Sequence, residues 1–166
     1  MAYFAELNTG ILEVERLLLA NADLCKLLYY TNTTDPLSAT PLSNPKVLRM
    51  TNLYPLPKSP NLETDKKAIV NYYFWAAKPQ RKNPRFNTVT LHFDVMCDLN
   101  TWTIKDAIRP YAICQKIDSI FNDATNVKLS IGDIWLQEMV GQRYSDSYYG
   151  YHLVYQMGQD SNSGVC

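Results

Sequence analysis

Hydrophobic and polar positions alternate most regularly between residues 88 and 97. One set of positions carries apolar side chains: Val89, Leu91, Phe93, Val95 and Cys97. The intervening set carries Thr88, Thr90, His92, Asp94 and Met96. A period of two over ten residues predicts a β-strand with one buried face. A second run at 67–76 predicts a partner strand, so the two runs predict an antiparallel hairpin with a long basic tip at 78–85.

Residues 9–30 show a different period and predict helix. Apolar side chains recur there at three-to-four spacing: Ile11, Val14, Leu17 and Leu18. Thr9 is expected to be the N-cap, because its hydroxyl can accept a hydrogen bond from a free backbone N–H of the first turn. Asn21 is expected to end this helix and to cap a second segment that runs to Tyr30.

A further helix is predicted after the alternating strand. Trp102 opens this element, Thr103 is expected to cap a helical turn, and Pro110 fits a first helical position, where its missing N–H has no cost. The apolar stripe of this helix consists of Ile113, Ile117, Ile120 and Phe121. Two more strands are predicted at about 127–139 and 148–157.

The order of these elements predicts an α+β fold. We expect helices to cover a mostly antiparallel sheet of four to five strands. Residues 1–157 are expected to form one domain, and the polar residues 158–166 a loose C-terminal tail.

Residues 31–65 contain six of the nine prolines. Proline removes a backbone donor and fixes φ, which argues against a long helix or a central strand. We predict an extended arm with one short strand at 46–51. An arm of this kind needs a partner surface, so Leu48, Met50 and Tyr54 are candidate interface residues.

Charge is distributed unevenly along a chain whose formal net charge is +0. From residue 46 to residue 85 there are nine cations and two acids, a net charge of +7, so the remainder carries −7. This stretch is either a solvated face or the basic side of a molecule that associates with complementary surfaces. In the second interpretation the hairpin tip lies at a protein interface through Lys78, Arg81, Lys82 and Arg85. Contact with nucleic-acid phosphates is an alternative role for the same cations.

Tyrosines crowd the last predicted strand, Tyr148 and Tyr149 among them. Strands favour aromatic side chains for packing, and tyrosine is also enriched at protein interfaces, so both interpretations stay open.

The sequence carries no recognisable catalytic or cofactor motif. Glycine-rich phosphate loops, GxSxG, HExxH and DxDxDG are all absent. His92 and His152 are expected to be exposed or cross-strand residues, and Asp94 and Asp98 to be solvated. Cys97 and Cys114 are expected to be buried thiols. We therefore expect a structural protein rather than an enzyme, with no catalytic residue, metal or cofactor. No apolar run approaches the ~18 residues needed to cross a membrane, so no membrane partner is expected.

Several segments together resemble the tail-terminator (tail-completion) proteins of long-tailed bacteriophages. They are LCKLLYYTNTTDPLS near the N-terminus, the proline-rich arm, NTVTLHFDVMCDLNTWTIKDAIRPYAICQKIDSIF, and the hairpin that ends in YYGYHLVYQM. The resemblance covers most of residues 11–157. Its most specific part is the alternating strand followed by Trp102, Arg109-Pro110 and the isoleucine-rich helix.

The resemblance implies an α+β subunit that forms a homo-hexameric ring at the head-proximal end of the tail tube. Such a ring ends tube polymerisation and offers the docking face for the head. The implied partners are other copies of the chain, the tail tube protein, a head-completion or connector protein and the tape-measure protein. Genomic DNA would pass through the lumen without being read. The implied location is the neck of the virion, after synthesis in the host cytoplasm.

Three alternative functions stay open. Another neck component or a tail-tube subunit would have a similar composition. A small-molecule-binding or enzymatic α+β domain would have a site under the arm. A nucleic-acid binder would use the basic loop, and its affinity would fall steeply with salt.

Overall fold

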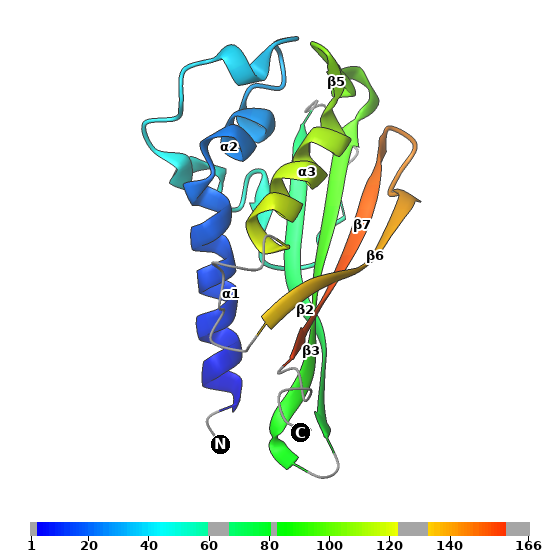
Figure 1. The fold of residues 1–166 in the computed structure, drawn as a ribbon. Coiled ribbons are helices and arrows are strands. Elements are labelled where there is room, and N and C mark those ends of the chain that lie inside the picture. Colours follow the sequence, from blue (N-terminus) through cyan, green and yellow to red (C-terminus); the bar gives the residue numbers. More distant parts are fainter. Residues whose placement is uncertain (1–2, 60–66, 81–82, 123–132, 159–166) are drawn as a thin grey trace, which may run out of the picture.

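The computed structural model describes residues 3–59, 67–80, 83–122 and 133–158 (Figure 1). The elements are α1 (Tyr3–Ala20), α2 (Ala22–Tyr29), η1 (Pro36–Ser38), η2 (Pro45–Leu48), β1 (Leu53–Tyr54), β2 (Ala68–Gln80), β3 (Asn83–Asp98), η3 (Leu99–Thr101), β4 (Thr103–Ile104), β5 (Ala107–Ile108), α3 (Arg109–Phe121), β6 (Asp133–Arg143) and β7 (Tyr148–Gly158). A five-stranded sheet has the order β1-β2-β3-β7-β6, and β4 and β5 form a separate pair. The fold is α+β, as the order of sequence patterns predicts.

The alternating segment forms the central strand β3. It pairs antiparallel with β2 on one side and with β7 on the other, while β1 is parallel to β2. The predicted apolar set is confirmed as buried, with 0% exposure at each position: Val89, Leu91, Phe93, Val95 and Cys97. Burial of each of the larger side chains stabilises the fold by about 1.5–3 kcal/mol. This face of β3 is therefore the centre of the core.

All three α-helices pack on this same face of the sheet (Figure 1). The helix α3 crosses β3, β7 and β6, whereas α1 lies along β2 and α2 bridges α1 and α3. In α3 the predicted stripe is confirmed, because Ile113, Ile117 and Phe121 are fully buried. The opposite face of the sheet carries no helix among the described residues.

Two helix starts differ from the prediction. The helix α1 begins at Tyr3, so Thr9 lies inside it and its hydroxyl donates to the carbonyl of Ala5 rather than capping. Thr103 lies in β4, and the third helix begins only at Arg109, with Pro110 in its first turn as expected. The Asn21 cap is confirmed, since its side chain accepts a hydrogen bond from the backbone N–H of Leu24.

The described part of the proline-rich segment, residues 31–59, lies against the body of the subunit. The strand predicted at 46–51 is wrong: Pro45 starts a 3₁₀ turn, and the short strand follows at Leu53–Tyr54. The Asn52 side chain donates to the carbonyls of Leu28 and Ala68, at 3.0 and 2.9 Å. Proline set the turn because its fixed φ suits a first helical position. Residues 60–65 of the predicted arm lie outside the described residues.

The β2–β3 hairpin is confirmed, but its strands are longer than predicted. They extend to Gln80 and from Asn83, so Lys78 and Arg85 belong to strands rather than to a long tip. Residues of β3 before Val89 pair only with β2, so this end of the hairpin projects beyond β7 and β6 (Figure 1). Arg81 and Lys82 lie outside the described residues.

The last two strands agree with the prediction in order and pairing. The strand β6 extends to Arg143, beyond the expected end, and the expected residues 127–132 lie outside the described residues. The predicted tail at 159–166 also lies outside them. Among the described helices, none combines the length and the hydrophobicity that a membrane crossing requires.

Candidate functional site

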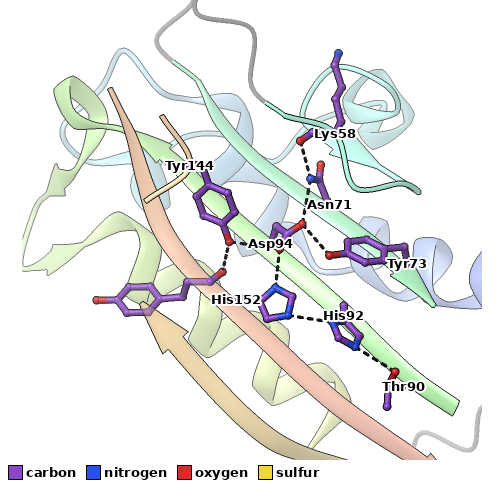
Figure 2. Close-up of polar contacts among 9 residues, drawn as sticks. Lys58, Asn71, Tyr73, Thr90, His92, Asp94, Tyr144 and His152 are labelled. Carbon is purple, nitrogen blue, oxygen red and sulfur yellow. Dashed lines mark hydrogen bonds and ion pairs between the residues drawn. The ribbon is translucent and has the colours of Figure 1, made fainter. Parts of the chain in front are cut away.

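The helix-free face of the sheet contains a buried polar cluster centred on Asp94 of β3 (Figure 2). The alternation of β3 places His92, Asp94 and Met96 on this face, and we expected it to be solvated. That expectation is wrong for Asp94 and Met96, which are 7% and 0% exposed. Tyr54, Ile69, Tyr144 and Tyr148 pack over Met96, because the chain after β1 and the β6–β7 turn fold across the sheet.

The Asp94 carboxylate accepts four side-chain hydrogen bonds. On Oδ1 the donors are His152 Nδ1 at 2.7 Å and the Tyr144 hydroxyl at 3.4 Å. On Oδ2 they are the Tyr73 hydroxyl at 3.1 Å and Asn71 Nδ2 at 3.3 Å. A carboxylate has about four lone-pair positions, so these donors fill its capacity. Figure 2 shows that they reach Asp94 from β2, from β7 and from the β6–β7 turn.

Two histidines continue the hydrogen-bond network away from Asp94. Nε2 of His152 lies 3.0 Å from Nδ1 of His92, and Nε2 of His92 lies 3.1 Å from the hydroxyl of Thr90. With both rings neutral, His152 donates to Asp94, His92 donates to His152, and Thr90 donates to His92. Every ring nitrogen of the pair then has a partner. His92 is thus a cross-strand residue, one of the two alternatives expected for it.

The surroundings of the cluster shift the pKa values of its members. Burial raises the pKa of Asp94, but the hydrogen bonds from His152, Asn71 and Tyr73 outweigh it and hold the pKa below its usual range. Burial and the neighbouring His152 lower the pKa of His92 to about 4. Burial and the Asp94 charge raise the pKa of Tyr73, and the same causes raise that of Tyr144. At neutral pH the cluster therefore holds an ionised Asp94, a neutral His92 and neutral tyrosines.

A hollow of about 290 Å³ lies beside the cluster. Its lining is polar and aromatic: Pro57, Lys58, Ser59, Asn71, Tyr73, Trp75, Asp94, Gln142, Tyr144 and His152. Trp75 is 68% exposed. The described residues contain no group of histidine, cysteine or acidic side chains arranged to hold a metal ion.

Nucleophilic chemistry has little support among the described cysteines. Burial raises the pKa of Cys25 to about 11 and of Cys114 to about 12, and it also raises the pKa of Cys97. A thiolate is the reactive form, so these thiols are unreactive at neutral pH. The prediction that Cys97 and Cys114 are buried is confirmed, with exposures of 0% and 6%.

A second buried charge, Arg109, lies on the helix-covered side of the sheet and is 1% exposed. Its guanidinium donates to four backbone carbonyls: Thr101 at 2.7 Å, Leu27 at 2.6 Å, and Tyr30 and Thr33 at 3.3 Å each. Leu27 and Tyr30 lie at the C-terminal end of α2, where free carbonyls carry partial negative charge. Arg109 therefore joins the end of α2 to the start of α3.

The strands β2 and β6 present exposed apolar side chains near the two edges of the sheet. Trp75 on β2 is joined by Trp135, Met139 and Val140 on β6, which are 39%, 41% and 43% exposed. On its outer side β2 pairs with β1 only at Val70 and Asn71. No described strand lies on the outer side of β6. The sheet is thus open at both edges.

The structure separates the residues that we predicted for an interface. Leu48, Tyr54 and Tyr148 are buried in the subunit itself, at 0%, 6% and 3% exposure, whereas Met50 is 57% exposed. The ring of Tyr149 lies 5.6 Å from the Arg143 guanidinium. Of the basic residues, Lys78 lies in β2 and Arg85 in β3, and Arg81 and Lys82 lie outside the described residues.

Sequence reasoning missed the Asp94 cluster. Asp98 was also expected to be solvated, but it is 6% exposed and its Oδ1 accepts from the backbone and side chain of Asn100. The sequence offered one signal: Thr90, His92 and Asp94 occupy alternate positions, so they share one face of β3. The pairing of Asp94 with His152 of β7 needed the strand register, which the sequence does not state.

Comparison with known proteins gives one positive result. A search of the curated proteins finds no match to this chain. A protein-family model described as YomW matches residues 21–157, a span that includes Asp94, its donors and Arg109. Because the match covers well over half of the chain, the protein belongs to the YomW family, a family associated with bacteriophages.

Proposed function

We propose that this chain is the tail terminator of a long-tailed bacteriophage, a structural subunit that forms a ring at the head-proximal end of the tail tube. Two findings support the proposal, the phage-associated family and the resemblance of the strand-to-helix unit at 88–122 to tail terminators. The observation that carries it is the open sheet. A subunit with one free edge on β2 and another on β6 can associate head to tail, and such contacts form a ring when the rotation between neighbours closes.

The chemistry of the helix-free face supports a structural role over an enzymatic one. The Asp94 carboxylate has a donor at each lone-pair position, so it offers no free acceptor to a substrate. His92 and His152 hydrogen-bond to one another and to their neighbours. Apart from Oδ1 of Asn71, the buried polar side-chain atoms of this network have hydrogen-bond partners, and such a network makes a face rigid. Rigidity suits a subunit that must present fixed surfaces to its neighbours.

In this proposal the ring contacts several virion components. Other copies of the chain complete the ring, the tail tube protein lies below it, and a head-completion or connector protein docks on top. The tape-measure protein ends at the ring, and genomic DNA crosses the lumen without sequence-specific contact. The ring is homo-hexameric and is located in the virion neck. The basic stretch from Lys46 to Arg85 and the acidic remainder supply complementary surfaces for these contacts.

Electron microscopy of the purified chain mixed with tail tubes that lack an end cap tests the proposal. We expect a single ring at one end of each tube and no further growth of the tube when free tube subunits are added. Bare ends and continued growth would overturn the proposal. A tail-tube subunit would instead polymerise into long tubes, and a connector would bind heads but leave tube growth unchanged.

A ligand-binding domain is the second candidate, and the hollow beside Asp94 favours it. The buried Oδ1 of Asn71, which lines this hollow, accepts no hydrogen bond, and aromatic side chains form part of the wall. A ligand that occupied the hollow would raise the melting temperature, and the rise would grow with the logarithm of the free ligand concentration once that exceeds the Kd. Thermal unfolding across a panel of small polar metabolites separates this candidate from the terminator.

A further inference from the structure

The two outer strands of the sheet differ in what they present to solvent. Beyond Asn71, β2 has no described strand on its outer side as far as Gln80. Along β6, from Asp133 to Arg143, the backbone N–H of Leu136 donates to the Asn122 side chain at 3.5 Å, and no described strand pairs with the outer side. The other outer N–H and C=O groups of such edges are templates for another strand.

Each edge carries only part of the usual protection against association: β6 contains Asp133, Glu138 and Arg143, and β2 contains Lys78 and Pro79, but both strands also present an exposed tryptophan. Edge strands of soluble proteins are commonly short, charged or interrupted by proline. The strand β6 has 11 residues, no proline, and exposed Trp135, Met139 and Val140. The strand β2 has its proline only at Pro79, and Trp75 is the most exposed large apolar side chain among the described residues. These edges suit a partner strand.

A groove of about 560 Å³ runs beside the open edge of β2. Its walls are Leu7, Asn8 and Ile11 of α1, the segment Pro55–Leu56–Pro57, and Tyr73, Phe74 and Trp75 of β2. The lining is mainly apolar, and it is located where the side chains of an added strand would lie. The β2 edge thus has a groove that can accept side chains of an added strand, and the β6 edge carries exposed apolar side chains.

We propose that β6 of one copy adds to the open edge of β2 of the next copy, with the exposed Trp135 of β6 in this groove. The direction of pairing follows from the sheet. The strands β2 and β6 run in opposite directions, since each neighbouring pair from β2 to β6 is antiparallel. A rotation about an axis along the strands preserves strand direction, so β6 meets the neighbour's β2 in antiparallel orientation.

Charge agrees with this orientation. Antiparallel pairing brings the start of β6, at Asp133, toward the end of β2 that contains Lys78. Opposite charges across paired strands stabilise the pair, and like charges destabilise it. Pairing of two β6 edges would leave the groove empty. The heterologous contact is therefore favoured over a two-fold dimer.

The inference rests on the proposed function only for closure of the contact into a ring. It names the surfaces by which neighbouring subunits meet, and it can be tested by directed disulfide formation. One preparation carries Ala76→Cys on β2, and another carries Glu138→Cys or Val140→Cys on β6. Both carry Cys166→Ser, because the other three native cysteines are buried. The preparations are mixed, oxidised alone and on tube ends, and analysed without reductant.

We expect a disulfide between the β2 variant and at least one β6 variant, with no β2-to-β2 product. Adding Trp135→Glu to the β6 variant should lower the yield of this product about tenfold or more, because a charge then enters the apolar groove. Leu99→Glu, at a position that is 50% exposed in η3, is the control and should leave the yield unchanged. Circular dichroism spectra of the variants establish that they fold.

The outcomes separate this inference from the proposed function. Rings at tube ends without any mixed disulfide would overturn the proposed edge contact and would still support the tail-terminator function. A mixed disulfide without capping of tubes would support the proposed edge contact and overturn the tail-terminator function. A product between two β6 cysteines alone, or no product under either condition, would also overturn the edge contact.

Discussion

Arg109 and Asp94 are buried charged groups on opposite faces of the sheet, and they are held differently. On the helix-covered face Arg109 is surrounded by backbone carbonyls from α2, from the chain after it and from η3. On the helix-free face Asp94 is surrounded by side chains from β2, β7 and the β6–β7 turn. Backbone partners are fixed by the fold itself, whereas side-chain partners depend on particular residues. The Arg109 site therefore depends on where the backbone lies, and the Asp94 site depends on the identity of particular side chains.

Replacement of Arg109 by alanine should give the largest effect. Four carbonyls lose their donor, and the end of α2 loses its link to α3, so we expect a loss of about 3–5 kcal/mol in the free energy of unfolding. Urea denaturation followed by circular dichroism measures this loss. Arg16→Ala is the control, since the Arg16 side chain is 68% exposed and should contribute less than about 0.5 kcal/mol. An equal effect of the two changes would contradict the role given to Arg109.

Asp94→Asn should have a smaller effect, about 2–3 kcal/mol in the free energy of unfolding. Asparagine offers one acceptor oxygen, and its amide hydrogens face groups that already donate: His152, Asn71 and the tyrosine hydroxyls. The same urea experiment measures the loss, with Asp146→Asn as the control because the Asp146 side chain is 91% exposed. A loss as large as that of Arg109→Ala would remove the distinction between the two faces.

Stability should depend on pH through His92. The pKa of His92 is about 4 in the folded protein and about 6.5 in an unfolded chain, so the unfolded state binds more protons between these values. Stability should therefore be full above pH 6.5 and fall as the pH decreases toward 4, by about 1 kcal/mol for a partly exposed ring. In the His92→Gln variant, the midpoint of urea denaturation should change less with pH across this range. The depressed pKa of Asp94 acts only at lower pH, below about 4.

Trp75→Ser should have the smallest effect on folding, below about 1 kcal/mol, because Trp75 is mostly exposed. Its effect on assembly should be larger, since Trp75 lines the groove that receives β6 in our proposal. The yield of the mixed disulfide between Ala76→Cys and the β6 variants measures this effect. An unchanged yield, with folding also unchanged, would place Trp75 outside the contact.

The fold was largely predictable from the sequence, because alternation at 88–97 and the stripe at 113–121 report directly on burial. The polar cluster was not predictable. The period of two predicts that Asp94 and Phe93 lie on opposite faces of the strand. It does not predict that Tyr144, 50 residues away in the sequence, donates a hydrogen bond to Asp94. The sequence singled out Arg109 because it precedes Pro110. It did not indicate the contact with the carbonyl of Leu27, which lies 82 residues away in the sequence. The open edges depend on strand order, which becomes known only when the strands are paired.

The proline-rich segment shows the same limit. Proline content predicted correctly that residues 31–59, the described part, form no long helix or central strand, since φ is fixed and donors are lost. It did not predict that Leu48 and Leu53 enter the core, because that depends on the space that α1, α2 and β2 leave between them. Two residues assigned to an interface, Leu48 and Tyr54, are consequently buried within the subunit.

The length distribution of tails in a phage that lacks this chain tests the central claim most directly. Interrupting the gene in the phage that encodes it and imaging the lysate by electron microscopy gives this distribution. The ring proposal predicts tail tubes of uncontrolled length that are not joined to heads, with normal tails restored when the intact gene is supplied in trans. Tails of normal length joined to heads in the absence of the chain would contradict it.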